Sequence, residues 1–303
     1  MSLNLSVVIP YHGRLKWLQD ALNSVLNQEK LPAELIIVDD FSSENPLSEI
    51  EKIKKQTDVP VTYLRFDAHK GVSYARNAGI RLAKADYIAF LDADDCWSSG
   101  HLKDFSTALK QIPEIKFYSA AYRGFSGQCP KELSRFVPEF QIIDYFKLAL
   151  KNSFLVNSSS VILSKDLIEK IGLFDTALNV MEDMDYWIRA GKMAPVVLNK
   201  NPRVFIRHSN RTSLSKRLEF YASEDLKKWF EKTLQTVENE EIKKFIHLNL
   251  YGTIMRFKKQ GEAPPAWLND LLNEKYLSVF QKLMLRQPPF FTEVLARILN
   301  KKR

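Results

Sequence analysis

Short apolar runs alternate with amphipathic segments over the first 95 residues of the chain. Four runs have the length and apolar content of buried strands, and they cover 5–9, 34–38, 61–66 and 87–91. Three segments between them repeat apolar residues at the helical period, and they cover 14–28, 46–56 and 71–85. Strands that alternate with helices in this way predict an α/β fold, in which helices flank both faces of a mostly parallel central sheet.

The pattern changes twice farther along the chain. After residue 98 the elements are less regular: helices are predicted at 101–112 and 182–192, strands at 115–122 and 203–208, and a strand with a short helix over 157–174. From residue 216 the sequence is charged, rich in lysine and helix-like. We therefore expect two domains, a sheet domain over 1–215 and a helical C-terminal extension over 216–303.

Three carboxylates follow the fourth predicted strand directly. In open α/β sheets ligands bind at the carboxyl ends of the strands, so Asp92, Asp94 and Asp95 are expected at the ligand-binding edge. Carboxylates two residues apart can bind Mg²⁺ or Mn²⁺, a hard cation that also binds substrate phosphate. The alternative is a solvated acidic turn before a helix, and we expect Asp95 to belong to that turn and helix start.

Other polar residues fall at the same predicted edge. Asp39 and Asp40 follow the second strand, where a carboxylate could accept a hydrogen bond from a nucleobase. The alternative is that the segment caps the next helix, since Asp40, Ser42 and Ser43 all suit an N-cap. Arg76 lies in the helix that Gly71 opens and could meet a diphosphate, or it could be a solvated surface arginine.

Two later segments add candidates for proton transfer and ligand binding. Glu182 and Asp183 begin a predicted helix, where an ionised carboxylate could take a proton from a hydroxyl or could simply complement the helix dipole. His208 follows a predicted strand and could bind a metal or phosphate, or could have no special role.

Charge and cysteine content narrow the choice of partners and location. The formal net charge of +8 favours anionic partners, but no helix-turn-helix or RNP-like motif points to nucleic acid. Two cysteines without a CxxC motif predict neither a disulfide framework nor a cysteine zinc site, so a reducing cytoplasm is the default expectation. The first residues do not read as a signal peptide, and no apolar stretch is long enough to span a bilayer.

Five segments in order resemble the family 2 glycosyltransferases of the GT-A fold. They are LSVVIPYHGRLKWLQDALNSVLNQ, ELIIVDDFSSE, KGVSYARNAGI, YIAFLDADDCW and IGLFDTALNVMEDMDYWIRAG. The resemblance covers about residues 3–215 and leaves the helical extension unmatched. Two positions depart from the family pattern: Phe41 replaces the glycine of its Asp-Asp-Gly-Ser stretch, and His12 stands where the family often has asparagine.

The resemblance implies a nucleotide site built from five of the matched residues. Pro10 and Tyr11 would line the nucleoside, Asp39 would contact the base, usually uracil, and Arg76 and Asp92 would lie at the nucleotide.

It also implies the metal and catalytic residues. Asp94 would bind the Mg²⁺ or Mn²⁺ that carries the diphosphate, and His208 would complete that site. Asp183 would be the catalytic base, with Glu182 beside it for the acceptor or donor sugar.

The implied reaction is the inverting, metal-dependent transfer of a sugar from a nucleoside diphosphate, most often UDP, to a hydroxyl acceptor. The acceptor would be a saccharide or a lipid-linked saccharide in polysaccharide or glycolipid biosynthesis. A nucleotidyltransferase is an alternative, although PYHGRLKW has a single glycine where such enzymes typically carry a glycine-rich loop. A dehydrogenase would need G-x-G-x-x-G there, which is absent. A non-catalytic nucleotide-sugar-binding protein is the remaining alternative, and the presence of both Asp94 and Asp183 argues against it.

The C-terminal tail from about residue 280 combines apolar and basic residues. A basic amphipathic helix can lie on an anionic bilayer, which would place a cytoplasmic protein at the inner face of the membrane. The tail could instead cover the catalytic domain or form a dimer contact, and the sequence leaves the oligomeric state open.

Overall fold

The computed structural model describes residues 3–130, 137–151, 156–208 and 217–288. The chain forms two compact units, residues 1–210 and 211–303, and each is described by itself.

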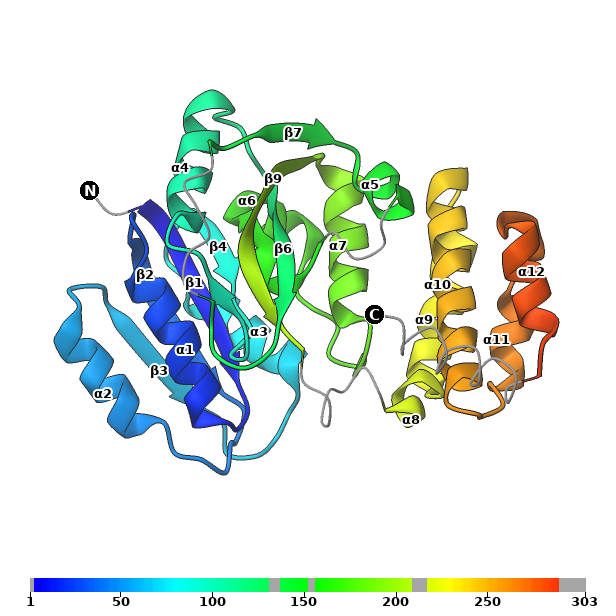
Figure 1. The fold of residues 1–303 in the computed structure, drawn as a ribbon, viewed down its shortest axis with the longest axis horizontal. Coiled ribbons are helices and arrows are strands. Elements are labelled where there is room, and N and C mark those ends of the chain that lie inside the picture. The colour runs from blue at the N-terminus through cyan, green and yellow to red at the C-terminus, as the bar shows by residue number, and fades with distance from the viewer. Residues whose placement is uncertain (1–2, 131–136, 152–155, 209–216, 289–303) are drawn as a thin grey trace. The chain divides into compact units, whose positions relative to one another are not determined.

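The first unit contains the sheet and seven α-helices within its described residues (Figure 1). Its strands are β1 (Leu3–Tyr11), β2 (Pro32–Asp39), β3 (Val61–Arg65), β4 (Tyr87–Phe90), β5 (Cys96–Trp97), β6 (Phe117–Phe125), β7 (Phe140–Ile143), β8 (Val161–Ser164) and β9 (Val196–Arg207). Its helices are α1 (Leu15–Leu26), α2 (Leu47–Gln56), α3 (Val72–Leu82), α4 (His101–Gln111), α5 (Tyr145–Lys151), α6 (Lys165–Ile171) and α7 (Glu182–Met193), and a 3₁₀ turn, η1, covers Ser158–Ser160.

The strands form one sheet in the order β3-β2-β1-β4-β8-β6-β9-β5, with β7 paired to β9. The four strands predicted from the apolar runs, β3, β2, β1 and β4, are parallel neighbours. Beyond them β8 runs antiparallel to both β4 and β6, and β9 is parallel to β6 but antiparallel to β5 and β7. The sheet is therefore parallel in its N-terminal half and mixed in the other half.

Both faces of the parallel half are covered by helices, as the strands' continuous apolar runs predicted (Figure 1). On one face Val7 and Ile9 share a core with residues of α1, α2 and α4, among them Leu22. On the other face α3 packs directly on β1, where a Cβ atom on Gly79 would lie only 2.2 Å from Cγ1 of Val8. Only glycine permits this approach, so it fixes how close the helix lies to the strand.

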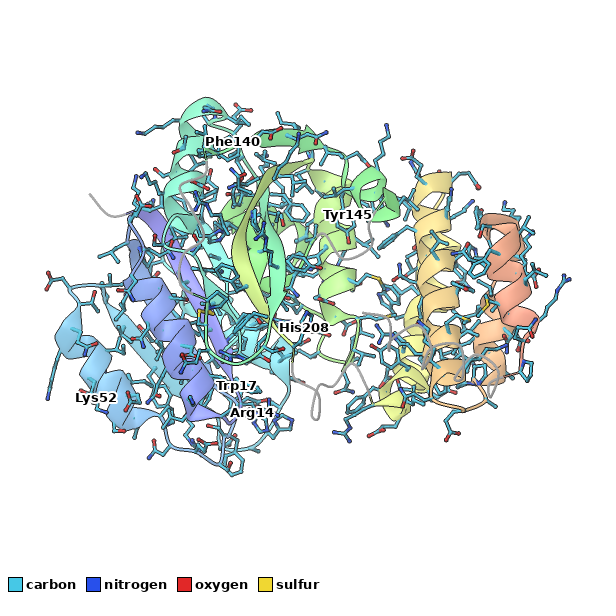
Figure 2. The ribbon with its side chains drawn as sticks, viewed as in Figure 1. Arg14, Trp17, Lys52, Phe140, Tyr145 and His208 are labelled. Atoms are coloured by element: carbon cyan, nitrogen blue, oxygen red, sulfur yellow. A yellow bond between two sulfur atoms is a disulfide. The ribbon has the colours of Figure 1, made fainter. Side chains whose placement is uncertain are left out.

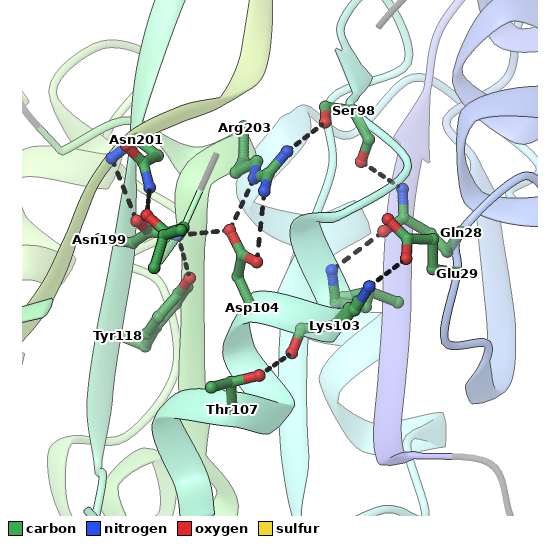
Figure 3. Close-up of polar contacts among 12 residues, drawn as sticks. Gln28, Glu29, Ser98, Lys103, Asp104, Thr107, Tyr118, Asn199, Asn201 and Arg203 are labelled. Atoms are coloured by element: carbon green, nitrogen blue, oxygen red, sulfur yellow. Dashed lines mark hydrogen bonds and ion pairs between the residues drawn. The ribbon is translucent and has the colours of Figure 1, made fainter. Parts of the chain in front are cut away.

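A buried polar network ties α4 to the far strands of the sheet (Figure 3). The Arg203 guanidinium donates from Nε to Oδ2 of Asp104 at 2.6 Å, and both side chains are almost fully buried. Asn199 donates to the same carboxylate oxygen at 3.0 Å and lies 3.2 Å from the Tyr118 hydroxyl. The desolvated charges of β9 and α4 are thus paired and hydrogen-bonded, as burial requires.

The two cysteines form a disulfide, Cys96–Cys129, which the sequence did not predict. Low cysteine content argues against a framework of several bridges, but one pair needs only two chain segments that lie side by side. Asp95 also differs from expectation: it is followed by strand β5 rather than by the start of a helix.

The second unit is helical throughout its described residues. Its helices are α8 (Leu218–Tyr221), α9 (Glu224–Thr236), α10 (Glu240–Lys259), α11 (Ala266–Leu271) and α12 (Val279–Arg286), with a 3₁₀ turn, η3, at Glu274–Tyr276. Side-chain caps begin three of them, because Ser223, Asn239 and Ser278 accept hydrogen bonds from the following backbone amides. No helix within the described ranges is long and apolar enough to cross a membrane.

Candidate active site

The carboxyl ends of β1, β2 and β4 bring the predicted site residues to one edge of the sheet. Tyr11 ends β1 beside Asp39, the last residue of β2, and both are buried. The backbone amide of Asp40 donates to the carbonyl of Tyr11 at 2.8 Å, so the two strand ends stay joined as they leave the sheet. Pro10 precedes this junction, opposite Val38.

Arg76 joins two of the predicted acidic residues from opposite sides. Its Nη2 donates to Oδ1 of Asp92 at 2.8 Å, and its Nη1 donates to Oε1 of Glu182 at 3.0 Å. Arg76 is 3% exposed, and its Nε has no hydrogen-bond partner. The arginine is therefore neither a solvated surface residue nor a free cation; it binds the segment after β4 to the first turn of α7.

The carboxylates at the start of α7 have raised pKa values. Burial, followed by the charge of Asp183, raises the pKa of Glu182 to about 7 against the attraction of Arg76. Burial also raises the pKa of Asp183, and Arg76 is the largest influence that opposes this. Met181, which precedes the helix, adopts a left-handed φ of 62° and sets the direction in which the helix leaves the preceding turn. A carboxyl group whose pKa is about 7, as that of Glu182 is, can gain or lose a proton near neutral pH.

The three carboxylates after β4 have different surroundings. Asp92 is paired with Arg76, and its backbone amide donates to Ser159 Oγ at 3.0 Å. Asp95 is 3% exposed and accepts hydrogen bonds from the Arg207 amide at 2.9 Å and from Ser159 Oγ at 2.6 Å. Asp95 is thus a buried anchor that holds the segment against β9 and η1.

Asp94 is the carboxylate that fits a metal ion. Among the described residues no side chain donates a hydrogen bond or forms an ion pair to it. Burial and the charge of Asp92 raise its pKa to about 6, whereas Arg207 and Arg14 lower it. A carboxylate that is costly to ionise could serve as a ligand for a hard divalent cation, which would relieve that cost.

His208 lies beside this segment at the end of β9. Its backbone amide donates to the carbonyl of Phe125 at 2.8 Å, and its ring covers Gly124, where a Cβ atom would lie 1.8 Å from Nε2.

Arg14 and Trp17 lie at the start of α1, with the Arg14 guanidinium 3.9 Å from the Trp17 ring (Figure 2). Arg207 approaches the same ring at 5.2 Å and donates from Nε to the backbone carbonyl of Asp94 at 2.8 Å.

Asp39 is enclosed by donors from its own chain. One oxygen accepts from the Ser42 amide at 2.8 Å and the Ser42 hydroxyl at 2.6 Å, while the other accepts from the Tyr63 hydroxyl at 2.8 Å and Arg65 Nη1 at 2.6 Å. Asp39 itself is 0% exposed. Its role at a nucleobase stays a prediction, and a base that reached it would have to replace one of these donors.

Phe41 shows how the turn tolerates the loss of the family's glycine. It adopts φ 58°, in the left-handed region that glycine occupies without strain. Its ring is exposed and lies 5.5 Å from the guanidinium carbon of Arg65. The backbone therefore keeps a glycine-like conformation in spite of the side chain.

Sequence reasoning missed three residues that organise this edge. Arg207 had a signal, since it directly precedes the candidate His208 at a strand end. Ser159 and Arg65 had none, because a serine in NSSS or an arginine at the end of a strand carries no pattern of its own.

Comparisons with known proteins place the chain among described families. A family model described as "Glycosyl transferase family 2" matches residues 6–172. An uncharacterized glycosyltransferase of Haemophilus influenzae is 27% identical over 219 residues, which cover 70% of this chain and 71% of that protein.

Two solved structures share its fold. Residues 1–349 of S. aureus TarS, in complex with UDP-GlcNAc, are 18% identical with a TM-score of 0.64, over 97% of this chain and 88% of that one. The mannosyltransferase PcManGT from Pyrobaculum calidifontis, in complex with GDP-Man and Mn²⁺, is 16% identical with a TM-score of 0.59, over 97% of this chain and 84% of that one.

Proposed function

Because this chain belongs to glycosyltransferase family 2 and has the GT-A fold, we propose that it transfers a sugar from a nucleoside diphosphate to a hydroxyl acceptor with inversion. Glycosyl transfer follows from the family; the donor, the metal and the stereochemistry are the proposal. We favour a UDP-sugar, which TarS binds in its complex, and a saccharide or lipid-linked saccharide as acceptor. GDP is the alternative nucleotide, as in the PcManGT complex.

The contact that carries the proposal is the pair of ion pairs made by Arg76. Through them Asp92, on the nucleotide side, and Glu182, next to Asp183, lie against one buried guanidinium. A proton acceptor and the residues that would hold the leaving nucleotide are thereby positioned together. A non-catalytic nucleotide-sugar-binding protein would not need Glu182 and Asp183 beside the nucleotide site. A nucleotidyltransferase would not need a base at the start of α7.

Asp183 acts as the base in this proposal. It takes the proton of the acceptor hydroxyl as that oxygen forms its bond to the anomeric carbon. The bond from that carbon to the diphosphate oxygen breaks, and the electron pair leaves with the nucleotide. Attack from the face opposite the leaving group inverts the configuration, and one carboxylate base is sufficient.

Asp94, with His208 as the second candidate ligand, would hold Mg²⁺ or Mn²⁺. Such a cation would stabilise negative charge on the departing diphosphate when bound. Arg207 fixes the segment that carries Asp94 through the 2.8 Å hydrogen bond to its backbone carbonyl, so the carboxylate stays at the same edge as Arg76.

The test compares two variants in a screen of nucleotide sugars that measures release of free nucleotide. Asp183→Asn should keep nucleotide binding and lose transfer by roughly two orders of magnitude or more, the usual scale for a lost general base. Asp94→Ala should instead abolish the thermal stabilisation that nucleotide gives only in the presence of Mn²⁺. Near-normal turnover by Asp183→Asn would refute its assignment as base.

The second unit offers a surface for peripheral membrane contact. Residues 289–303 of the tail lie outside the described residues, but α12 exposes Val279, Phe280 and Leu283 and also carries Lys282 and Arg286. Apolar side chains beside basic ones favour an anionic bilayer, which would bring a cytoplasmic enzyme to a lipid-linked acceptor. Flotation with anionic vesicles tests this, and absence of binding would leave a protein–protein contact as the use of this face.

A further inference from the structure

Two histidines and a carboxylate that have no role in the proposed reaction meet where the chain leaves β1. His12, Asp40 and His69 each offer a ligand atom within 4.8 Å of the others. They come from three separate segments, namely the residues that follow β1, those that follow β2 and those that precede α3. The two imidazole rings lie 4.3 Å apart between centroids and are tilted by 33°.

The surrounding hydrogen bonds orient these side chains as metal ligands are oriented. Nδ1 of His12 lies 2.8 Å from the backbone carbonyl of Asp40. A carbonyl can only accept, so Nδ1 carries the proton and donates, which leaves the Nε2 lone pair free. Metal-binding histidines almost always donate their other ring N–H to a carbonyl or carboxylate in this way.

The carboxylate of Asp40 is held equally firmly. It is 3% exposed and accepts backbone hydrogen bonds from the Lys70 amide at 2.6 Å and the Gly71 amide at 2.8 Å. Its Oδ2 also lies 2.8 Å from Nδ1 of His69. Two carboxylate oxygens have about four lone-pair positions, so these three contacts leave one position, on Oδ1, for a further bond.

Both histidines are exposed, so a metal ion could reach them and their side chains could close around it. Ligands bonded to zinc at 2.0–2.1 Å in tetrahedral geometry lie roughly 3.3 Å apart. The ligand atoms of His12, Asp40 and His69 lie within 4.8 Å of one another, and rotation of the two exposed imidazoles can bring them to the shorter spacing that zinc needs. The fixed element is the buried carboxylate, and the mobile ones are the rings.

We propose that His12, His69 and Asp40 form a second metal site, for a borderline cation such as Zn²⁺ or Co²⁺, separate from the Mg²⁺ or Mn²⁺ site at Asp94. Two imidazole nitrogens and one carboxylate suit Zn²⁺ and Co²⁺, whereas Mg²⁺ and Mn²⁺ prefer oxygen ligands. Three protein ligands leave a position open for water or a ligand atom. The site lies directly after Pro10 and Tyr11, so it would border any nucleoside bound there. The inference rests on these contacts alone and does not depend on the proposed reaction.

The experiment measures binding of Zn²⁺ and of Co²⁺ to the full, untagged chain without nucleotide, by calorimetry and by the visible absorption of Co²⁺. We expect one Zn²⁺ or Co²⁺ per chain, with Mn²⁺ bound at least tenfold more weakly. His12→Asn and His69→Asn should each weaken Zn²⁺ binding by roughly tenfold or more, since each removes a ligand. His247→Asn is the matched control, because His247 lies in α10 of the second unit and its removal should leave Zn²⁺ affinity unchanged. His208→Asn instead distinguishes this site from the one proposed at Asp94, because loss of Zn²⁺ binding in that variant would assign the ion to the Asp94 site.

Thermal unfolding in a chelator shows whether the variants remain folded. Asp40→Asn is the less suitable variant, because Asp40 anchors two backbone amides, so the two exposed histidines carry the test. The proposal is overturned if the wild-type chain binds no Zn²⁺, if the His12→Asn/His69→Asn double variant binds it as well as wild type, or if His208→Asn removes the binding.

Discussion

Glu182→Gln should change how the stability of the protein depends on pH. Glutamine keeps an oxygen that can accept the 3.0 Å hydrogen bond from Arg76, but it removes a negative charge next to Asp183. The wild-type carboxyl has a pKa of about 7 in the fold against an ordinary value of 4.5. The folded state therefore holds this proton more tightly than the unfolded state.

The sign and size of the effect follow from linkage between protonation and folding. The protonated carboxyl stabilises the fold fully below its ordinary pKa, and this contribution is lost as the pH rises through about 7. At about 1.4 kcal/mol for each tenfold change in proton affinity, the loss amounts to roughly 3 kcal/mol. The glutamine of the variant has no proton to lose, so the variant keeps its stability as the pH rises. Its free energy of unfolding minus that of wild type should therefore increase by roughly 3 kcal/mol between pH 4.5 and pH 8.

Urea unfolding at closely spaced pH values from 4.5 to 8 measures this difference. Glu49→Gln is the matched control: Glu49 lies in α2, and a hydrogen bond from Lys52 lowers its pKa. Its ionised form is the favoured one, so that variant should not gain on wild type as the pH rises. A difference between Glu182→Gln and wild type that stays flat, or falls with pH, would refute the reasoning.

Two further pairs of variants test the packing that positions the site. Arg203→Met strands the buried carboxylate of Asp104 and should cost about 3–5 kcal/mol of unfolding free energy (Figure 3). Lys103 lies next to Asp104 in α4 and forms an exposed ion pair with Glu29, so Lys103→Met should cost less than about 1 kcal/mol. Denaturant titration compares them, and equal losses would contradict the account of the buried pair. Phe41→Val should destabilise by roughly 1 kcal/mol or more because a β-branched residue fits φ 58° poorly, while Phe41→Gly should stay within about 1 kcal/mol of wild type. A valine variant as stable as the glycine variant would show that the left-handed turn is not maintained.

In the parallel half of the sheet, β1, β2 and β4 could be predicted because nearly all of their residues are buried. Each then appears as an unbroken apolar run, and the helices between them follow the 3.6-residue period. The mixed half could not be predicted in the same detail. β7 is short and largely exposed, and the direction of β8 is set by its neighbours, β4 and β6, rather than by its own sequence. The strand predicted at 203–208 is the end of the longer β9, whose pairing with β6 shifts register near Ala121.

For the candidate site, the sequence indicated candidate residues but not their contacts. The motifs indicated Asp39, Arg76 and Glu182, because residue types and order suffice for that. Sequence could not show that Tyr63 and Arg65 enclose Asp39, since those donors are more than 20 residues away along the chain. Nor could the sequence show that Arg76 forms ion pairs with two carboxylates, Asp92 and Glu182. The apolar periodicity of a helix predicts the helix but not the segments that contact it.

Arg76 pairs with both Asp92 and Glu182, which the proposed function assigns to the nucleotide and to the acceptor or donor sugar respectively. A ligand that weakens the ion pair between Arg76 and Asp92 would strengthen the one between Arg76 and Glu182. In the same way, a change in the charge of Glu182 would change the strength of the Arg76–Asp92 ion pair. Two half-sites that share one counter-ion are linked by a coupling free energy, and such coupling acts equally in both directions. If the proposed assignment holds, occupation of one half would change the affinity of the other, and this single buried side chain would link the binding of the two substrates.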